Sequence, residues 1–249
     1  MLNVLTSKAK DPSEQFVAEK RRKGEGNLDW LARNLETLAG EEGAKGSAYL
    51  ALFGGKEKAD FRLRVAQGHI RHDMSPSHFS HVVLLRASGP SKGGSLWEIS
   101  LEPDGGFGYP PSDNGVQAGS LKSYESANQY PNLAVMRLPV KLRELQRTLK
   151  DFKKQRADQD CVELILVWLA YVWGVGRASN PLLDGKGIPS ATFIEALVAS
   201  SGYDLTPGLA SRSSCPEAIW QAAKWWQDFY TADQREPIRG MWHLQHFLG

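Results

Sequence analysis

The chain has little cysteine, no apolar run long enough to cross a membrane, and no marked excess of charge of either sign. Only two of its 249 residues are cysteine, Cys161 and Cys215. A disulfide framework needs more cysteine than this, so we expect two free thiols, although the sequence also permits one bridge between them. The 30 basic and 28 acidic residues give a net charge of +2. This balance provides no general attraction to nucleic acid or to a membrane surface, and we expect neither as a partner.

A run of ten apolar residues covers positions 164–173. A membrane-spanning helix needs about 20 such residues, so this run predicts a buried helix and no transmembrane segment. The first residues, MLNVLTSKAKDPSEQF, lack the basic start and apolar core of a signal peptide. We therefore expect synthesis in the cytoplasm without standard export.

The first 46 residues differ in composition and periodicity from the rest of the chain. They are charged and carry two helical patterns, the second of which runs from Leu28 to Leu38. From residue 47 to 138 short apolar runs alternate with Gly, Pro, Ser and Asp, which is typical of an antiparallel sheet. The predicted strands are AYLALFGG, FRLRVAQ, SHVVLLRA, SLWEISLEP and NLAVMRLP. We interpret residues 1–46 as an N-terminal helical lead-in and 47–249 as the main domain.

The remaining segments predict a loop and helices. DGGFGYPPSDNGVQAGS, between the last two strands, is a long surface loop that is expected to border a binding cleft. After Pro139 helical spacing predicts four helices, over 141–156, 158–174, 190–202 and 215–230. Ser190 is the expected N-cap of the third, and Pro216 lies in the first turn of the fourth. The fold class is therefore α+β, an antiparallel sheet packed against helices.

Cys161 is placed where a thiol becomes reactive. A helix that begins near Asp158 or Asp160 puts its sulfur in the first turn, where free N–H groups and the helix dipole favour the thiolate. The acidic neighbour Asp160 opposes this effect, so a histidine partner is also needed. A lone cysteine is more often a small buried hydrophobe, and that alternative stays open.

His81 and Glu98 are the candidate partners of this thiol. His81 opens the strand SHVVLL, and Glu98 lies 17 residues later on the next predicted strand. A carboxylate beside a strand-borne imidazole fixes its tautomer and orientation while the other ring nitrogen faces the thiol. Glu102 is a second candidate for the same orienting role.

The segment HIRHDMSPSHFSH contains four of the six histidines, namely His69, His72, His78 and His81. Imidazoles at such spacings can bind zinc, yet the segment lacks cysteine and has one carboxylate, Asp73. A metal-dependent hydrolase that uses these histidines is the alternative interpretation. The leading interpretation needs neither metal nor cofactor.

The order of these parts resembles the circularly permuted NlpC-type papain-like hydrolases. The parts occur in this order: a histidine strand, an acid on the next strand, the AVMRLP strand, and a cysteine that opens an apolar helix. In addition, GIPSATFIEAL resembles the stretch that these proteins carry after the cysteine helix. The resemblance covers residues 47–210. It implies a papain-like catalytic domain with Cys161 as nucleophile, His81 as base and Glu98 as orienting acid. Tyr171 matches a tyrosine of some members, although a core aromatic explains it equally well.

More narrowly, SLWEISLEP, NGVQAG and YPNLAVMRLP resemble permuted hydrolases of the TseH-like kind, which are type VI secretion effectors. This implies an antibacterial amidase or endopeptidase that cleaves amide bonds in peptidoglycan stem peptides in the periplasm of a target cell. It also implies a delivery protein and a cognate immunity protein as partners. Other permuted relatives act on lipids or acyl groups. After the cysteine many members have a small residue and an acid; this chain has Val162 and Glu163, so it keeps only part of that pattern. A non-catalytic binding module on the same scaffold is the remaining alternative.

Overall fold

The computed structural model describes residues 16–86, 94–101, 112–154, 160–225, 232, 236 and 238–245. Within them, seven strands form one mixed sheet in the order β1-β7-β6-β2-β3-β4-β5. The strands are β1 (Phe16–Ala18), β2 (Ser47–Gly54), β3 (His81–Leu85), β4 (Ser95–Glu98), β5 (Gln117–Ser120), β6 (Asn132–Lys141) and β7 (Arg239–His243). All neighbouring pairs are antiparallel except β1 and β7, which are parallel. The α+β class is confirmed, whereas the purely antiparallel sheet is corrected to a mixed one.

Six α-helices and several short 3-10 turns complete the described part of the chain. The α-helices are α1 (Asn27–Ala39), α2 (Lys58–Ala66), α3 (Leu142–Phe152), α4 (Cys161–Trp173), α5 (Pro189–Ser200) and α6 (Pro216–Trp225). The 3-10 turns are η2 (Gly68–Ile70), η3 (Asp113–Gly115), η4 (Leu121–Tyr124), η5 (Pro181–Asp184) and η6 (Ser211–Ser213). No helix of these residues is both long and apolar enough to span a bilayer.

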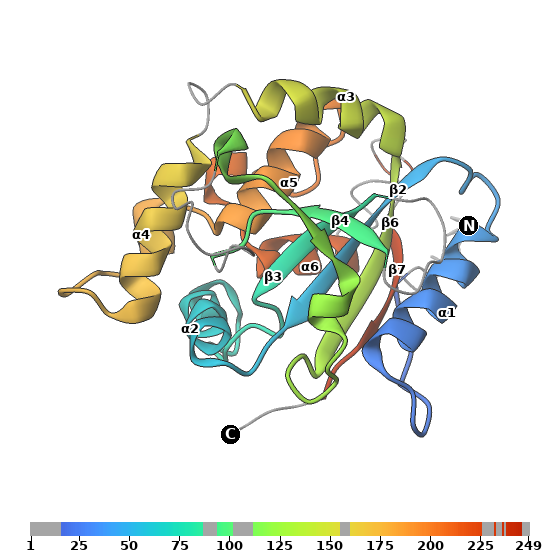
Figure 1. Cartoon of the computed structure of the whole chain (residues 1–249), viewed down its shortest axis with the longest axis horizontal. Helices are drawn as coiled ribbons and strands as arrows, with labels where there is room; N and C mark the ends of the chain where they lie inside the picture. Colours follow the sequence, from blue (N-terminus) through green and yellow to red (C-terminus); the bar gives the residue numbers. More distant parts are fainter. Residues whose placement is uncertain are drawn as a thin grey trace, which may run out of the picture.

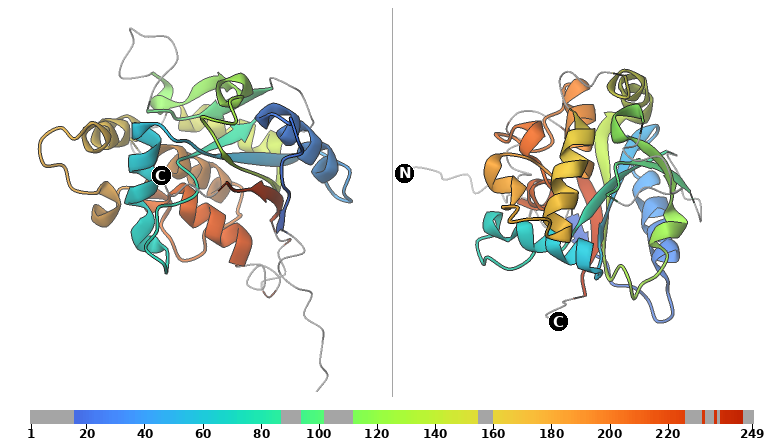
Figure 2. Two further views of the ribbon diagram at one scale, coloured as in Figure 1. Left: turned by 90° about the horizontal axis from the view of Figure 1, so that it is seen from below. Right: turned by 60° about the vertical axis from the view of Figure 1, so that its left-hand side comes forward.

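The sheet separates two hydrophobic layers (Figures 1 and 2). On one face, alternate residues of the central strands, such as Leu50 and Leu84, pack against α3, α5 and α6. On the other face, their sequence neighbours, such as Tyr49 and Val83, pack against α1 and η4. This two-residue alternation follows from strand geometry, because successive side chains point to opposite faces. The view on the right of Figure 2 shows α1 on one side of the sheet and α4 and α5 on the other.

The N-terminal segment is part of the sheet rather than only a helical lead-in. The helix expected before residue 19 falls largely outside the described residues, and its described end is the strand β1, which pairs with β7. The second expected helix is α1, whose Trp30, Leu31, Leu35 and Leu38 cover the sheet face that α5 leaves free. Residues 16–39 thus add both a strand and a helix to the main sheet.

Four of the five predicted strands are present, and the prediction of a strand at FRLRVAQ is wrong. FRLRVAQ lies mostly in α2, where Leu63 and Ala66 are buried while Phe61 and Val65 are exposed. Its apolar and basic residues alternate as in a strand, but contact with α4 selects a helix whose buried side follows helical spacing. Of the long loop expected over 104–120, residues 104–111 lie outside the described residues, and 117–120 form the edge strand β5.

The central buried helix is α5, not α4. Nine of the twelve residues of α5 are buried, and the helix packs against β3. By contrast, α4 lies at the side of the molecule in Figure 1 and exposes Leu166 and Trp173. The apolar run 164–173 therefore supplies a half-buried outer helix, which corrects the expectation of a wholly buried one. Its start agrees with the prediction, since Asp160 caps it by accepting from the N–H groups of Val162 and Glu163 at 3.0 Å.

Candidate active site

His81 stands at the first position of β3, as its sequence context predicts. Its strand is paired with β2, where His81 lies opposite Phe53. The preceding residue, Ser80, is fixed by its N–H, which donates to the carbonyl of Phe53 at 2.9 Å. The imidazole is therefore aimed by a central, doubly paired strand, which holds a side chain more rigidly than a loop does.

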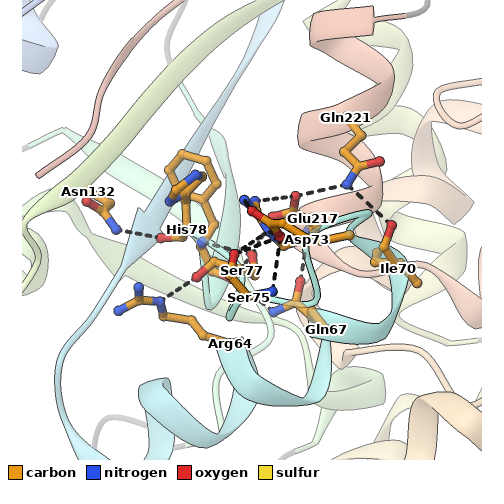
Figure 3. Close-up of polar contacts among 12 residues, drawn as sticks. Arg64, Gln67, Ile70, Asp73, Ser75, Ser77, His78, Asn132, Glu217 and Gln221 are labelled. Carbon is orange, nitrogen blue, oxygen red and sulfur yellow. Dashed lines mark hydrogen bonds and ion pairs between the residues drawn. The ribbon is translucent and has the colours of Figure 1, made fainter. Parts of the chain in front are cut away.

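The segment that leads into β3 is held by buried polar contacts (Figure 3). One carboxylate oxygen of Glu217 accepts from the Ser77 hydroxyl at 2.7 Å, and the other accepts from the Arg71 guanidinium at 2.9 Å. The Gln67 amide donates to the carbonyl of Phe79 at 2.9 Å. These contacts fasten residues 71–79 to α2 and α6, so the backbone in front of His81 is fixed on both sides.

Glu98 forms the expected pair with His81. Continuing the β3–β4 register places Glu98 opposite Val83, on the same sheet face as His81 and diagonal to it. Nε2 of His81 lies 2.7 Å from Oε2 of Glu98. The hydroxyl of Tyr124 donates to the same carboxylate oxygen, and the Tyr124 ring stacks on the imidazole with a centroid separation of 5.9 Å. The side chains of Glu98 and Tyr124 thus fix the plane and the tautomer of the histidine.

The charge state of Glu98 follows from these partners. Burial raises the pKa of its carboxyl, but the hydrogen bond and charge of His81 and the hydrogen bond from Tyr124 outweigh burial and leave that pKa below its usual value. Glu98 is therefore an ionised acceptor at neutral pH. Because a carboxylate only accepts, Nε2 of His81 carries the proton and Nδ1 keeps its lone pair in the neutral ring.

A cavity of about 80 Å³ lies beside this pair. It is formed where α2, β3 and α5 begin and where β4 ends. The polar residues that line it are Glu57, Asp60, Ser80, His81, Ser100, Tyr124, Tyr130 and Ser190. Asp60 accepts from the Ser80 hydroxyl at 2.6 Å, and burial raises the pKa of its carboxyl. The lining combines a base, acidic groups and hydroxyls in a small enclosed space.

Ser190 is the hydroxyl of this cavity that its surroundings leave unsatisfied. The structure places the N-cap of α5 at Ile188, with Pro189 as the first helical residue, so Ser190 is not the cap that its sequence context predicts. The residue is 1% exposed, and its Oγ has no hydrogen-bond partner in the described part of the chain. Buried hydroxyls nearly always find a partner, so this exception makes Ser190 a candidate functional residue. The first turn of α5 adds the positive end of a twelve-residue helix at the same point.

Cys161 occupies a different environment. Its backbone N–H donates to the Asn114 side chain at 3.0 Å, and the residue is fully buried in the core cluster that also holds Ile99 and Ile165. Burial raises the pKa of its thiol to about 12, the Thr192 side chain lowers it in part by hydrogen bonding, and the charge of Asp160 raises it. Cys161 does not line the cavity that contains His81. The structure thus joins His81 and Glu98 but places the predicted nucleophile in apolar packing.

Of the remaining candidates, the described Tyr171 does not line this cavity. Tyr171 packs edge-on against Trp168, with 5.6 Å between the ring centroids. Glu102 lies outside the described residues. Both cysteines are free, so the bridge that the sequence permitted is absent.

The four clustered histidines do not converge. His81 binds Glu98, and Nδ1 of His69 instead contacts the carbonyl of Ala66 at 2.9 Å. In the part of the chain that the structure describes, no three His, Cys, Asp or Glu side chains are grouped so as to hold a metal ion. The arrangement gives no support to the zinc interpretation of HIRHDMSPSHFSH.

The sequence prediction named His81 and Glu98, which the structure pairs, but it did not name Tyr124 and it took Ser190 for a helix cap. The signal for Ser190 was the Pro189-Ser190 pair in front of an apolar helix, which identified a helix start without telling which side chain faces a cavity. Tyr124 lies in a short 3-10 turn whose sequence carries no periodic pattern. Searches against protein-family models, curated proteins and solved structures found no match for this chain.

Proposed function

We propose that the protein is a hydrolase of amide or ester bonds in which Ser190 is the nucleophile, His81 the general base and Glu98 the orienting acid. The observation that carries the proposal is that Ser190, whose buried Oγ is unpartnered, lines the same cavity as His81. A serine is a weak nucleophile unless a base takes its proton, and an imidazole held by a carboxylate is the usual base.

The proposed reaction follows the acyl-transfer scheme. Nδ1 of His81 takes the proton of Ser190 Oγ while the oxygen attacks the carbonyl carbon of the substrate, and the ring then gives this proton to the leaving group. Water, activated by the same imidazole, releases the acyl group from Ser190. The backbone N–H of Ser190, in the first turn of α5, is suited to stabilise the developing oxyanion, a contribution of about 3 kcal/mol per donor.

Ser190 and His81 do not hydrogen-bond in this structure. Catalytic hydrogen bonds are often long in the absence of substrate and shorten in the productive complex. The proposal therefore requires an approach of Nδ1 and Oγ on substrate binding.

The proposal retains the papain-like, permuted NlpC-type scaffold but changes its nucleophile. In a cysteine hydrolase Cys161 would have to ionise beside His81, but its thiol has a pKa of about 12 and the residue does not line the cavity at His81. The sequence resemblance makes peptidoglycan stem peptides the first substrate to test, with delivery by a type VI system into the periplasm of a target cell. A delivery protein and an immunity protein are the partners that such a role requires.

A fluorophosphonate probe tests the nucleophile without knowledge of the substrate, because it forms a covalent bond only with an activated hydroxyl. We expect it to modify Ser190, as located by peptide mass spectrometry, and to leave the Ser190→Ala and His81→Ala variants unmodified. Ser200→Ala, on the same helix, is the matched control and should label normally. Digestion of purified peptidoglycan, followed by mass analysis of the fragments, then identifies the bond.

Three results would contradict the proposal. Activity that survives in Ser190→Ala but disappears in Cys161→Ala would return the role to the cysteine. Full activity in His81→Ala would remove the base from the mechanism altogether. A folded wild-type protein that neither reacts with the probe nor hydrolyses any substrate would favour the non-catalytic binding module.

A further inference from the structure

A second cavity, of about 300 Å³, lies beside α6 and is larger than the cavity at His81. We call it the α6 cavity. Its walls come from η2, η5, the segment 206–215 and α6, and it shares no lining residue with the cavity at His81. Its volume lies at the lower end of the range found for small-molecule sites.

Small side chains create this space. Ala218 and Ala222, one turn apart on α6, both line it, as do Ser213 and Cys215. The larger apolar lining residues Ile70 and Leu209 are 37% and 39% exposed. The lining thus combines small side chains with partly exposed apolar residues.

The lining carries no ionised carboxylate, ammonium or guanidinium group. Among the described residues that surround the α6 cavity there is no Asp, Glu, Lys or Arg. Burial raises the pKa of the Cys215 thiol to about 12, so this group is neutral as well. A charged ligand would lose its hydration here without gaining an ion pair, which is costly. The site therefore favours an uncharged ligand.

Two polar side chains of the lining have an acceptor atom without a described partner. The Gln221 amide donates to the carbonyl of Ile70 at 3.5 Å and to the carboxylate of Glu217 at 3.0 Å (Figure 3). Both partner atoms are acceptors, so the NH₂ group must face them and Oε1 is left to accept. His69 is oriented in the same way, because Nδ1 must carry the proton to bind the carbonyl of Ala66 at 2.9 Å. Its Nε2 is then an acceptor in the neutral ring.

We propose that the α6 cavity binds a small, uncharged, largely apolar molecule that carries a hydrogen-bond donor such as a hydroxyl or an N–H group. The apolar body would contact Ala218, Ala222 and Leu209, and the donor would reach Gln221 or His69. This site is independent of the hydrolase proposal, since neither its residues nor its test involves His81 or Ser190.

The probe N-phenyl-1-naphthylamine matches this chemistry, because it is neutral and aromatic, has one N–H donor, and fluoresces more strongly in an apolar site. We expect saturable binding by the full chain. The related anion 8-anilino-1-naphthalenesulfonate has the same aromatic body with an added sulfonate, and it should bind at least tenfold more weakly.

Two substitutions test whether the neutral probe binds in the α6 cavity. Ala218→Leu and Ala222→Leu should each fill the cavity and weaken binding of the neutral probe at least tenfold. Ala199→Leu, at an exposed position of α5, is the matched control and should change the affinity by less than twofold. Circular dichroism confirms which variants are folded, and the comparison of the two probes in the wild type needs no variant. Absence of saturable binding, equal affinity for the two probes, or unchanged affinity in either folded filling variant would overturn the proposal.

Discussion

The imidazole of His81 and the carboxylate of Glu98 face each other across β3 and β4, with 2.7 Å between Nε2 and Oε2. They are 17 residues apart in sequence and become diagonal neighbours because the two strands are antiparallel. The Tyr124 hydroxyl binds the same oxygen from a different segment. The histidine is thus oriented from one side and leaves Nδ1 for chemistry on the other.

Removing the charge of Glu98 tests whether this orientation matters for catalysis. Glu98→Gln preserves the shape of the side chain but can hold the wrong tautomer of His81, so we expect kcat to fall by about 100-fold or more. Tyr124→Phe removes one hydrogen bond and should cost much less, roughly tenfold. Steady-state kinetics measures both variants, and circular dichroism checks the fold. Equal losses in the two variants would contradict a tautomer-fixing role.

The lowered pKa of Glu98 predicts how the loss of activity in Glu98→Gln depends on pH. Because that pKa is held below its usual value, Glu98 stays ionised through the neutral and mildly acidic range. The activity gap between wild type and Glu98→Gln should therefore persist down to mildly acidic pH and narrow only at strongly acidic pH. The pH profile of kcat/KM for the two proteins measures it.

Both thiols should be inert in the folded protein. Cys161 and Cys215 are buried, and burial raises the pKa of each to about 12. A neutral, inaccessible thiol does not react with disulfide reagents. We expect negligible reaction with 5,5′-dithiobis(2-nitrobenzoate) at pH 7.5 and two thiols released in denaturant. Fast reaction of one native thiol would contradict this and would revive Cys161 as a nucleophile.

Glu195 predicts a pH-dependent stability. Burial raises the pKa of its carboxyl to about 7, hydrogen bonds from Thr206 and Ser214 lower it in part, and the charge of Asp204 raises it. Below about pH 4.5 the group is protonated in both the folded and unfolded states and has no effect. As pH rises towards 7 the unfolded state ionises first, so stability is lost, by an amount on the order of 3 kcal/mol when complete.

Glu195→Gln should remove this loss. The variant is expected to unfold with nearly the wild-type free energy at pH 4.5 and to exceed the wild type by roughly 3 kcal/mol at pH 8. Urea denaturation followed by tryptophan fluorescence measures both. A variant that is equally or less stable than wild type at pH 8 would contradict the predicted ionisation. The conservative change keeps the acceptor for Thr206.

The Arg71–Glu217 pair holds the segment before β3, and breaking it should be costly. The Glu217 side chain is 1% exposed, so Arg71→Ala leaves an almost fully buried carboxylate without its guanidinium. We expect a loss of about 3 kcal/mol in the free energy of unfolding. The double variant Arg71→Ala/Glu217→Gln should regain part of it, because no buried charge remains. If the double variant loses as much free energy of unfolding as Arg71→Ala and Glu217→Gln lose together, the two residues are not coupled.

The sequence alone determined the elements whose patterns depend on near neighbours. The short apolar runs of β2, β3 and β6 and the capped start of α4 at Asp160 are visible in the local sequence. His81 and Glu98 were recognisable for the same reason, because one strand start and one following strand bring them to a single face. The α+β class could be predicted from these local patterns alone.

Tertiary structure decided everything that depends on which surfaces meet. FRLRVAQ became helical because α4 packs against it, and α5 rather than α4 became the central helix because α5 covers β3. The same packing buried the Cys161 thiol among apolar groups and placed Ser190 in the lining of the cavity at His81. A first-turn position gives a nucleophile its helix dipole, but only the packing of that helix determines whether a base can reach it. The local pattern is identical for a residue that lines a cavity and one that faces the core, so the sequence alone could not show that Ser190 lines the cavity at His81 while Cys161 lies in the core.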